Sequence, residues 1–136
     1  LGTITATGTL LGGLKVVRVP VPASATGAYW SNPETSTVVA EAIMVWTSAG
    51  TGTFDMGVSS DGTSGQANMI DGGTMLAGVY SNGTISATAT LGVVNNRYQL
   101  VKPGGSGTNN SITVIHDEST TGTAAGYLIV RYVNTV

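Results

Sequence analysis

The segment TVVAEAIMVWT, residues 37–47, decides the fold class because apolar residues occupy both of its alternating faces. Successive side chains of a β-strand point to opposite faces of its sheet. One face of this segment is continuously apolar and carries Val38, Ala40, Ala42, Met44 and Trp46. The other face carries Val39, Ile43 and Val45, and only Glu41 interrupts it. The pattern predicts a central strand that is covered on both faces.

Two explanations of the second apolar face stay open. The strand can lie at the centre of a β-sandwich, or its second face can pack against another subunit. The second explanation makes Val39, Ile43 and Val45 candidate interface residues.

Period-2 alternation recurs along the rest of the chain, and no stretch shows the i, i+3, i+4, i+7 spacing of an amphipathic helix. Strands are expected at residues 4–11, 14–21, 37–47, 53–58, 75–80, 84–91, 97–102, 111–116 and 127–133. Turn-forming pairs and triplets separate them, among them Gly12-Gly13, Asp71-Gly72-Gly73 and Asn82-Gly83. We expect one all-β domain over residues 1–136, a jelly-roll-like β-sandwich of about 8–9 antiparallel strands. An immunoglobulin-like sandwich is the alternative, although the chain lacks its cysteine pair.

Composition limits the function. The 136 residues include no cysteine, which excludes thiolate catalysis and Cys-based zinc sites. Charged residues make up 9% of the chain, against about 25% in ordinary domains, so neighbours are expected to cover part of the surface. The alternative is that Thr, Ser and Asn side chains solvate the surface adequately.

The five basic residues are scattered and the net charge is −2, which argues against nucleic acid as a partner. No apolar run approaches the roughly 20 residues of a membrane-spanning helix, so no membrane partner is expected.

The sequence offers little catalytic chemistry. His116 is the single histidine, and the adjacent Asp117 would point to the opposite face of a continuing strand. A serine nucleophile would need a Gly-x-Ser-x-Gly elbow, which is missing. Asp55, Asp61 and Asp71 lie near Gly-rich loops, but their spacing is not that of a calcium loop, and Asp in a turn usually bonds its own backbone. We expect a protein that is not an enzyme, with no catalytic residue, cofactor or metal.

Tyr29 and Trp30 are the best candidates for ligand contact. They lie in a segment, residues 23–35, that is rich in small and polar residues and is expected to be an irregular loop. Aromatic side chains in a loop suit an interface anchor or a sugar-stacking platform. A loop that folds over one end of the sandwich is the alternative.

Two further stretches carry a family resemblance. Residues 53–73 read TFDMGVSSDGTSGQANMIDGG, and residues 122–136 read GTAAGYLIVRYVNTV. A strand, an Asp-Gly-rich loop, a short apolar segment and a final Gly-led strand resemble the pattern of small tailed-bacteriophage structural proteins of the capsid decoration or head-fibre type. The resemblance implies a homotrimer on the outer surface of the virion that contacts the major capsid protein and stabilises the capsid.

A tail-fibre module is the alternative that this resemblance leaves open. Tail-fibre domains share the same sandwich architecture. Such a module would bind a receptor or a carbohydrate, with Tyr29 and Trp30 in its site.

Overall fold

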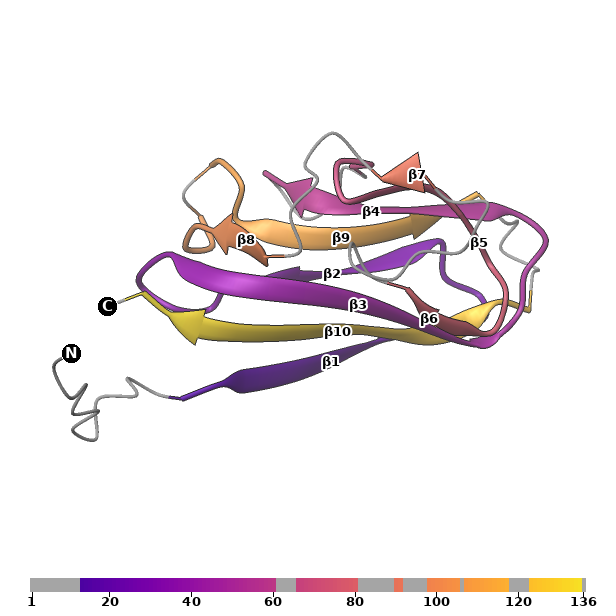
Figure 1. Cartoon of the computed structure of the whole chain (residues 1–136), viewed down its shortest axis with the longest axis horizontal. Coiled ribbons are helices and arrows are strands. Elements are labelled where there is room, and N and C mark those ends of the chain that lie inside the picture. Colours follow the sequence, from indigo (N-terminus) through magenta and orange to yellow (C-terminus); the bar gives the residue numbers. More distant parts are fainter. Residues whose placement is uncertain are drawn as a thin grey trace, which may run out of the picture.

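The computed structural model describes residues 13–60, 66–80, 90–91, 98–105, 107–117 and 123–135. These residues form strands and no helix (Figure 1). The strands are β1 (Lys15–Val21), β2 (Gly27–Ser31), β3 (Val38–Ser48), β4 (Thr53–Ser59), β5 (Ile70–Thr74), β6 (Gly78–Tyr80), β7 (Thr90–Leu91), β8 (Tyr98–Val101), β9 (Ser111–His116) and β10 (Ala125–Asn134). Every pairing between them is antiparallel. The expected all-β class is therefore confirmed.

The strands form two sheets that pack on each other as layers (Figure 1). Sheet A has the order β1-β10-β3-β6, with β8 also paired to β3, and sheet B has the order β2-β9-β4-β5-β7. The chain alternates between the sheets from β1 to β4 and again from β5 to β10, so β4 and β5 are consecutive strands of the same sheet. With β1 beside β10 and β2 beside β9, the order is that of a jelly roll. The predicted β-sandwich is confirmed.

Strand β3 lies inside sheet A because both of its edges are paired. β10 follows one edge along residues 38–48. On the other edge, β8 pairs with residues 38–41 and β6 with residues 44–46. The side chains that face sheet B are almost completely buried, and they are Val38, Ala40, Ala42, Met44 and Trp46. The first apolar face of the sequence pattern is therefore the sheet A side of the core.

Aromatic contacts join the two sheets. The ring of Trp46 in β3 meets Phe54 at 5.5 Å and His116 at 5.7 Å between centroids, both edge to face. The ring of Trp30 in β2 lies 4.9 Å from that of Tyr132 in β10. Aromatic pairs of this kind contribute about 0.5–1.5 kcal/mol each beyond the area they bury. These contacts fix how sheet B lies on sheet A.

Some expected boundaries are wrong. The irregular loop expected at residues 23–35 contains β2, and the Asp71-Gly72-Gly73 turn lies inside β5. Of the strand expected at residues 75–80, only residues 78–80 form β6. The expected strand at residues 4–11, and most of the one at 84–91, lie outside the described residues.

The misassigned turn in β5 is a β-bulge. Between the pairs Phe54–Gly73 and Met56–Ile70 lie one residue of β4 and two residues of β5, so β5 carries one extra residue. Gly72 takes a φ of 66° there, and its N–H donates to Oδ1 of Asp55 at 2.9 Å. The turn-forming composition of this stretch therefore serves a bulge within the sheet.

Candidate interaction surface

The outward side of sheet A is the candidate functional surface, and we call it the outer face. It is formed by alternate side chains of four neighbouring strands, those that point away from sheet B. Its members are Leu14 next to β1; Val16, Arg18 and Pro20 of β1; Tyr127, Ile129, Arg131 and Val133 of β10; Val39, Glu41, Ile43 and Val45 of β3; and Tyr98 and Leu100 of β8.

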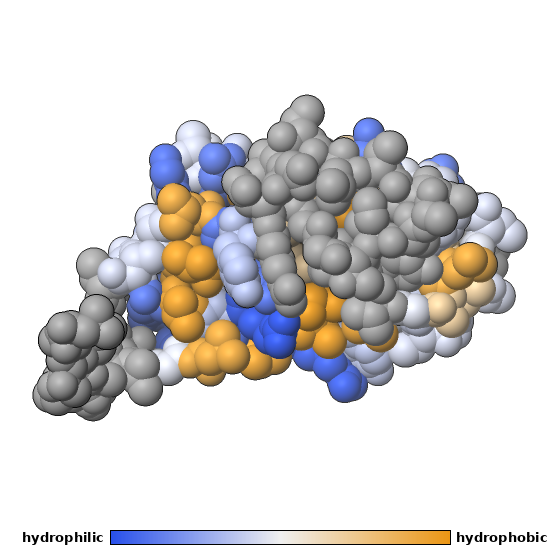
Figure 2. Space-filling view, in the orientation of Figure 1, coloured by the Kyte–Doolittle hydropathy of each residue, from blue (hydrophilic) through white to orange (hydrophobic). Residues whose placement is uncertain are grey.

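Most of this face is apolar, and half of its residues are exposed to solvent. Val16 is 60% and Leu100 is 64% exposed, and Leu14, Tyr98 and Val133 are exposed as well. Figure 2 shows hydrophobic surface near β8 and the adjoining ends of β3 and β10, with a hydrophilic patch beside it. Scattered apolar residues are normal on a protein surface, but contiguous ones mark interaction sites. The outer face has the composition of a contact surface.

The charges on the outer face are engaged within the face. The register places Val16, Arg131, Glu41 and Tyr98 in one row across four strands. Nη2 of Arg131 lies 2.9 Å from Oε1 of Glu41, whose side chain is almost fully buried. A buried carboxylate requires such a partner, because desolvating an unpaired charge costs several kcal/mol. Because Glu41 is paired with Arg131, its charge does not prevent the outer face from packing against a partner without intervening water.

A second cation on this face uses an aromatic ring. The guanidinium carbon of Arg18 lies 3.8 Å from the ring centroid of Tyr127. Such a cation–π contact attracts the guanidinium to the face of the ring. The aliphatic part of the Arg18 side chain can then contribute to the apolar surface of the outer face.

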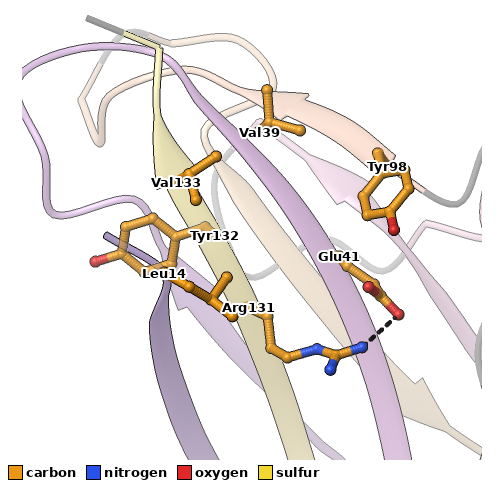
Figure 3. Close-up of a pocket in the computed structure, with 7 residues that line it drawn as sticks. All are labelled: Leu14, Val39, Glu41, Tyr98, Arg131, Tyr132 and Val133. Atoms are coloured by element: carbon orange, nitrogen blue, oxygen red, sulfur yellow. Dashed lines mark hydrogen bonds and ion pairs between the residues drawn. The ribbon is translucent and has the colours of Figure 1, made fainter. Parts of the chain in front are cut away.

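One end of the outer face is hollowed (Figure 3). The hollow has a volume of about 280 Å³ and is lined by Leu14, Val39, Glu41, Tyr98, Arg131, Tyr132 and Val133. Figure 3 shows the Arg131–Glu41 pair on one side of it and the aliphatic side chains of Val39 and Val133 on the other. Because its carboxylate is held by a guanidinium, this hollow suits an apolar side chain of a partner better than acid–base chemistry.

A polar cluster ties β1 to the segment between β2 and β3. Nζ of Lys15 pairs with Oε1 of Glu34, and the Tyr132 hydroxyl donates to the same oxygen at 3.1 Å. The hydrogen bond with Lys15, followed by that from Tyr132, lowers the pKa of Glu34 below its ordinary value of 4.5. The same Lys15 bond raises the pKa of Lys15, and burial raises the pKa of Tyr132.

Three of the candidate residues from the sequence lie together on the outer face. Val39, Ile43 and Val45 project from β3 and are half-buried in the single chain. Their neighbours across the register are Val133, Ile129 and Tyr127 of β10. The second apolar face of residues 37–47 is therefore continued by the next strand.

The other two candidates are separated. Tyr29 and Trp30 lie on strand β2 and not in an irregular loop, so their side chains point to opposite faces of sheet B. Trp30 is 5% exposed and packs on Tyr132 in the core, whereas Tyr29 is 51% exposed. The pair does not form a shared aromatic platform.

His116, Asp55 and Asp117 have structural partners, whereas Asp61 lies outside the described residues. His116 is buried, and Nε2 lies 2.6 Å from the carbonyl oxygen of Ala25; a carbonyl only accepts, so Nε2 carries the proton. The Asp117 carboxylate accepts from the N–H of Thr53 at 2.7 Å, just as Asp55 accepts from Gly72. Among the described residues, no group of three or more His, Asp or Glu is placed to hold a metal ion.

The sequence did not identify the β1, β8 and β10 parts of the outer face. The signal was available in residues 14–21, where Leu14, Val16 and Pro20 alternate with Val17 and Val19. Both faces of this stretch therefore carry apolar residues, as both faces of residues 37–47 do. The same criterion that selected residues 37–47 also selects residues 14–21.

Comparisons with known proteins add no relative: no family model, no curated protein and no solved structure matches the chain. In the part of the chain that the structure describes, no helix is long and apolar enough to cross a membrane.

Proposed function

We propose that this chain is a structural subunit of a tailed-bacteriophage head, which decorates the capsid and stabilises it through contacts made by the outer face of sheet A. Its partners are copies of itself, in a homotrimer, and the major capsid protein. Its place is the outer surface of the virion.

The observation that carries the proposal is the apolar outer face. In one copy it exposes Leu14, Val16 and Leu100 to water, while its buried carboxylate is already paired. Burial of apolar surface stabilises by about 25 cal/mol per Å², so covering this face favours association. The jelly-roll order, which viral capsid domains use, and the low content of charged residues support the same function.

The subunit would act by mass action. Each copy that binds the assembled shell, and not the dissociated parts, lowers the free energy of the assembled state. Such a role needs rigid surfaces and no reacting group.

The first test is the oligomeric state of the outer-face variant Leu100→Asp. We expect the wild-type chain to sediment as a trimer and the variant to shift to monomer, because the contact would have to bury an unpaired carboxylate. Leu76→Asp is the matched control, since Leu76 is 58% exposed, lies between β5 and β6 and is not one of the outer-face residues. Equal behaviour of the two variants would contradict the role of this face.

The second test is binding to empty heads of the phage that encodes the chain. Wild-type protein and Leu76→Asp are expected to co-sediment with the heads, and Leu100→Asp to remain in the supernatant. A wild-type chain that is strictly monomeric and does not bind heads would overturn the proposal.

The carbohydrate-binding alternative relied on Tyr29 and Trp30 acting together. Because Trp30 is part of the core, only Tyr29 remains available on that surface. No observation on the described residues favours this alternative over the contact-making role.

A further inference from the structure

A closed ring of three copies needs two different contact patches on each copy. A flat face that packs against the same face of another copy gives a two-fold dimer. In a three-fold ring, each copy instead presents one patch to one neighbour and a second patch to the other. The outer face of sheet A supplies one of these patches. The homotrimer therefore requires a second patch elsewhere on the chain.

Tyr29 lies on a side of the molecule that can provide this second patch. Among the described residues, the exposed large hydrophobic side chains outside the outer face are Tyr29 and Leu76. Tyr29 is 51% exposed and points away from sheet A, because the adjacent Trp30 points into the core. The Tyr29 ring and the outer face thus lie on opposite sides of the two-layered sandwich (Figure 1). Tyr29 can therefore contact the outer face only of another copy.

The Tyr29 side chain stands among small residues. Gly27 and Ser31 share its side of β2. Across the register it lies beside Thr113 of β9, which is 1% exposed, and Gly57 of β4 follows Thr113 in the same row. None of these neighbours has a side chain of comparable size. A concave partner surface can therefore surround the ring, as it does around the aromatic residues that anchor many interfaces.

The hollow on the outer face has the size and the lining for one tyrosine side chain. Its volume of about 280 Å³ lies just below the roughly 300–1,000 Å³ of pockets that hold drug-sized ligands. Leu14, Val39 and Val133 give it apolar walls, and Arg131 gives it a charged side (Figure 3). Tyrosine matches both kinds of wall, because it combines an apolar ring with a polar hydroxyl.

Arg131 can bind both parts of a tyrosine. The bond from its Nη2 to Glu41 uses one of the N–H donors of the guanidinium. The Arg131 side chain is 37% exposed, and a hydroxyl oxygen can accept from another of its N–H groups. The guanidinium can also stack on the ring, as that of Arg18 does on Tyr127 at 3.8 Å. A leucine such as Leu76 offers neither contact.

We propose that Tyr29 of one copy inserts into the hollow on the outer face of the next copy, and that three such contacts close the homotrimer. This inference rests on the proposed function, which supplies the trimer and the use of the outer face as a contact surface. Each copy contributes a ring on one side and a hollow on the other, so the three contacts are identical.

Truncation of Tyr29 is the first test. Because Tyr29 is exposed in the single chain, Tyr29→Ala should fold as the wild type does, which circular dichroism checks. The concentration at which half of the chains are assembled should rise at least about tenfold, as expected for an interface hot spot. Tyr29→Phe keeps the ring and should assemble much better than Tyr29→Ala.

Leu76→Ala is the matched control for this truncation. Leu76 is exposed to a similar degree, at 58%, and is expected to be dispensable for assembly. Sedimentation over a series of concentrations measures all of these proteins. Equal assembly of Tyr29→Ala and Leu76→Ala would overturn the inference.

Photo-crosslinking identifies the surface that residue 29 contacts. With p-benzoylphenylalanine at position 29, irradiation of the assembled protein should produce crosslinks to Leu14, Val39 or Val133 of another copy. Mixing isotope-labelled and unlabelled chains before irradiation shows whether the joined peptides come from different copies. The same group at position 76 should not crosslink to the hollow. Crosslinks from position 29 that lie within one copy, or that reach a different surface, would contradict the inserted tyrosine.

The failure of this inference can be told apart from the failure of the proposed function. A wild-type trimer that is dissociated by Leu100→Asp but not by Tyr29→Ala would keep the proposed function and rule out the Tyr29 contact. A wild-type chain that is monomeric and does not bind heads would rule out both.

Discussion

Tyr29 and Trp30 are adjacent in the sequence but lie in opposite environments. The strand geometry of β2 sends Trp30 into the core against Tyr132 and leaves Tyr29 on the outside of sheet B. Whether an aromatic residue binds a ligand or stabilises the core therefore depends on strand parity, which composition does not reveal.

The two aromatic residues should differ sharply in their effect on stability. Trp30→Ala is expected to lower the free energy of unfolding by about 3–5 kcal/mol, because it leaves a cavity between the sheets. Tyr29→Ala should change it by less than about 0.5 kcal/mol, as is usual at exposed positions. Denaturant unfolding of both variants measures the difference, and similar losses would show that Trp30 does not join the sheets.

Glu34 makes stability depend on acid pH. Its pKa is lower in the folded chain than its ordinary value of 4.5, so its contribution is complete above that pH and is lost as pH falls through the folded pKa. Thermal melts should show wild type more stable than Glu34→Gln at neutral pH, with the difference shrinking below pH 4.5.

Two comparisons check this interpretation of Glu34. Tyr132→Phe keeps the Lys15 partner, so it should preserve most of the acid dependence. A difference between wild type and Glu34→Gln that persists unchanged down to the lowest pH would show that the charge of Glu34 is not its source.

Single elements differ in how far their sequences predict them. β3, β4, β9 and β10 lie close to their expected positions because alternating apolar residues fill them. β2 was missed because its two aromatics stand among Gly, Ala and Ser, which are typical of loops. β5 was missed because Asp71, Gly72 and Gly73 read as a turn, and only the pairing with β4 shows the stretch to be a bulge.

The bulge in β5 should tolerate substitutions according to their backbone preference. A Cβ atom added at Gly72 would meet no atom within 4 Å, so we attribute the loss on substitution to its φ of 66°. Gly72→Val should cost about 1–2 kcal/mol or more, and Gly72→Asn clearly less, since Asn adopts this conformation more readily. Equal losses in denaturant unfolding would mean that φ at residue 72 does not limit stability.

At the scale of the whole molecule, the outer face arises from strands far apart in the chain. Residues 37–47 predicted Val39, Ile43 and Val45 as one apolar set, but β1, β8 and β10 join them only through the jelly-roll pairing. Alternation in a sequence gives the two faces of each strand. It does not tell which faces of different strands lie side by side, because that depends on strand order and register.

Contacts through this face should respond to salt as apolar contacts do. Arg131 with Glu41, and Arg18 with Tyr127, are engaged within one chain, so few charges remain on the outer face to attract a partner. Raising sodium chloride should leave self-association almost unchanged, and sulfate should strengthen it, because sulfate favours burial of apolar surface. Sedimentation at low and high salt measures this, with Leu76→Asp expected to follow wild type. Dissociation at high sodium chloride would instead indicate a contact held by charges, which screening weakens.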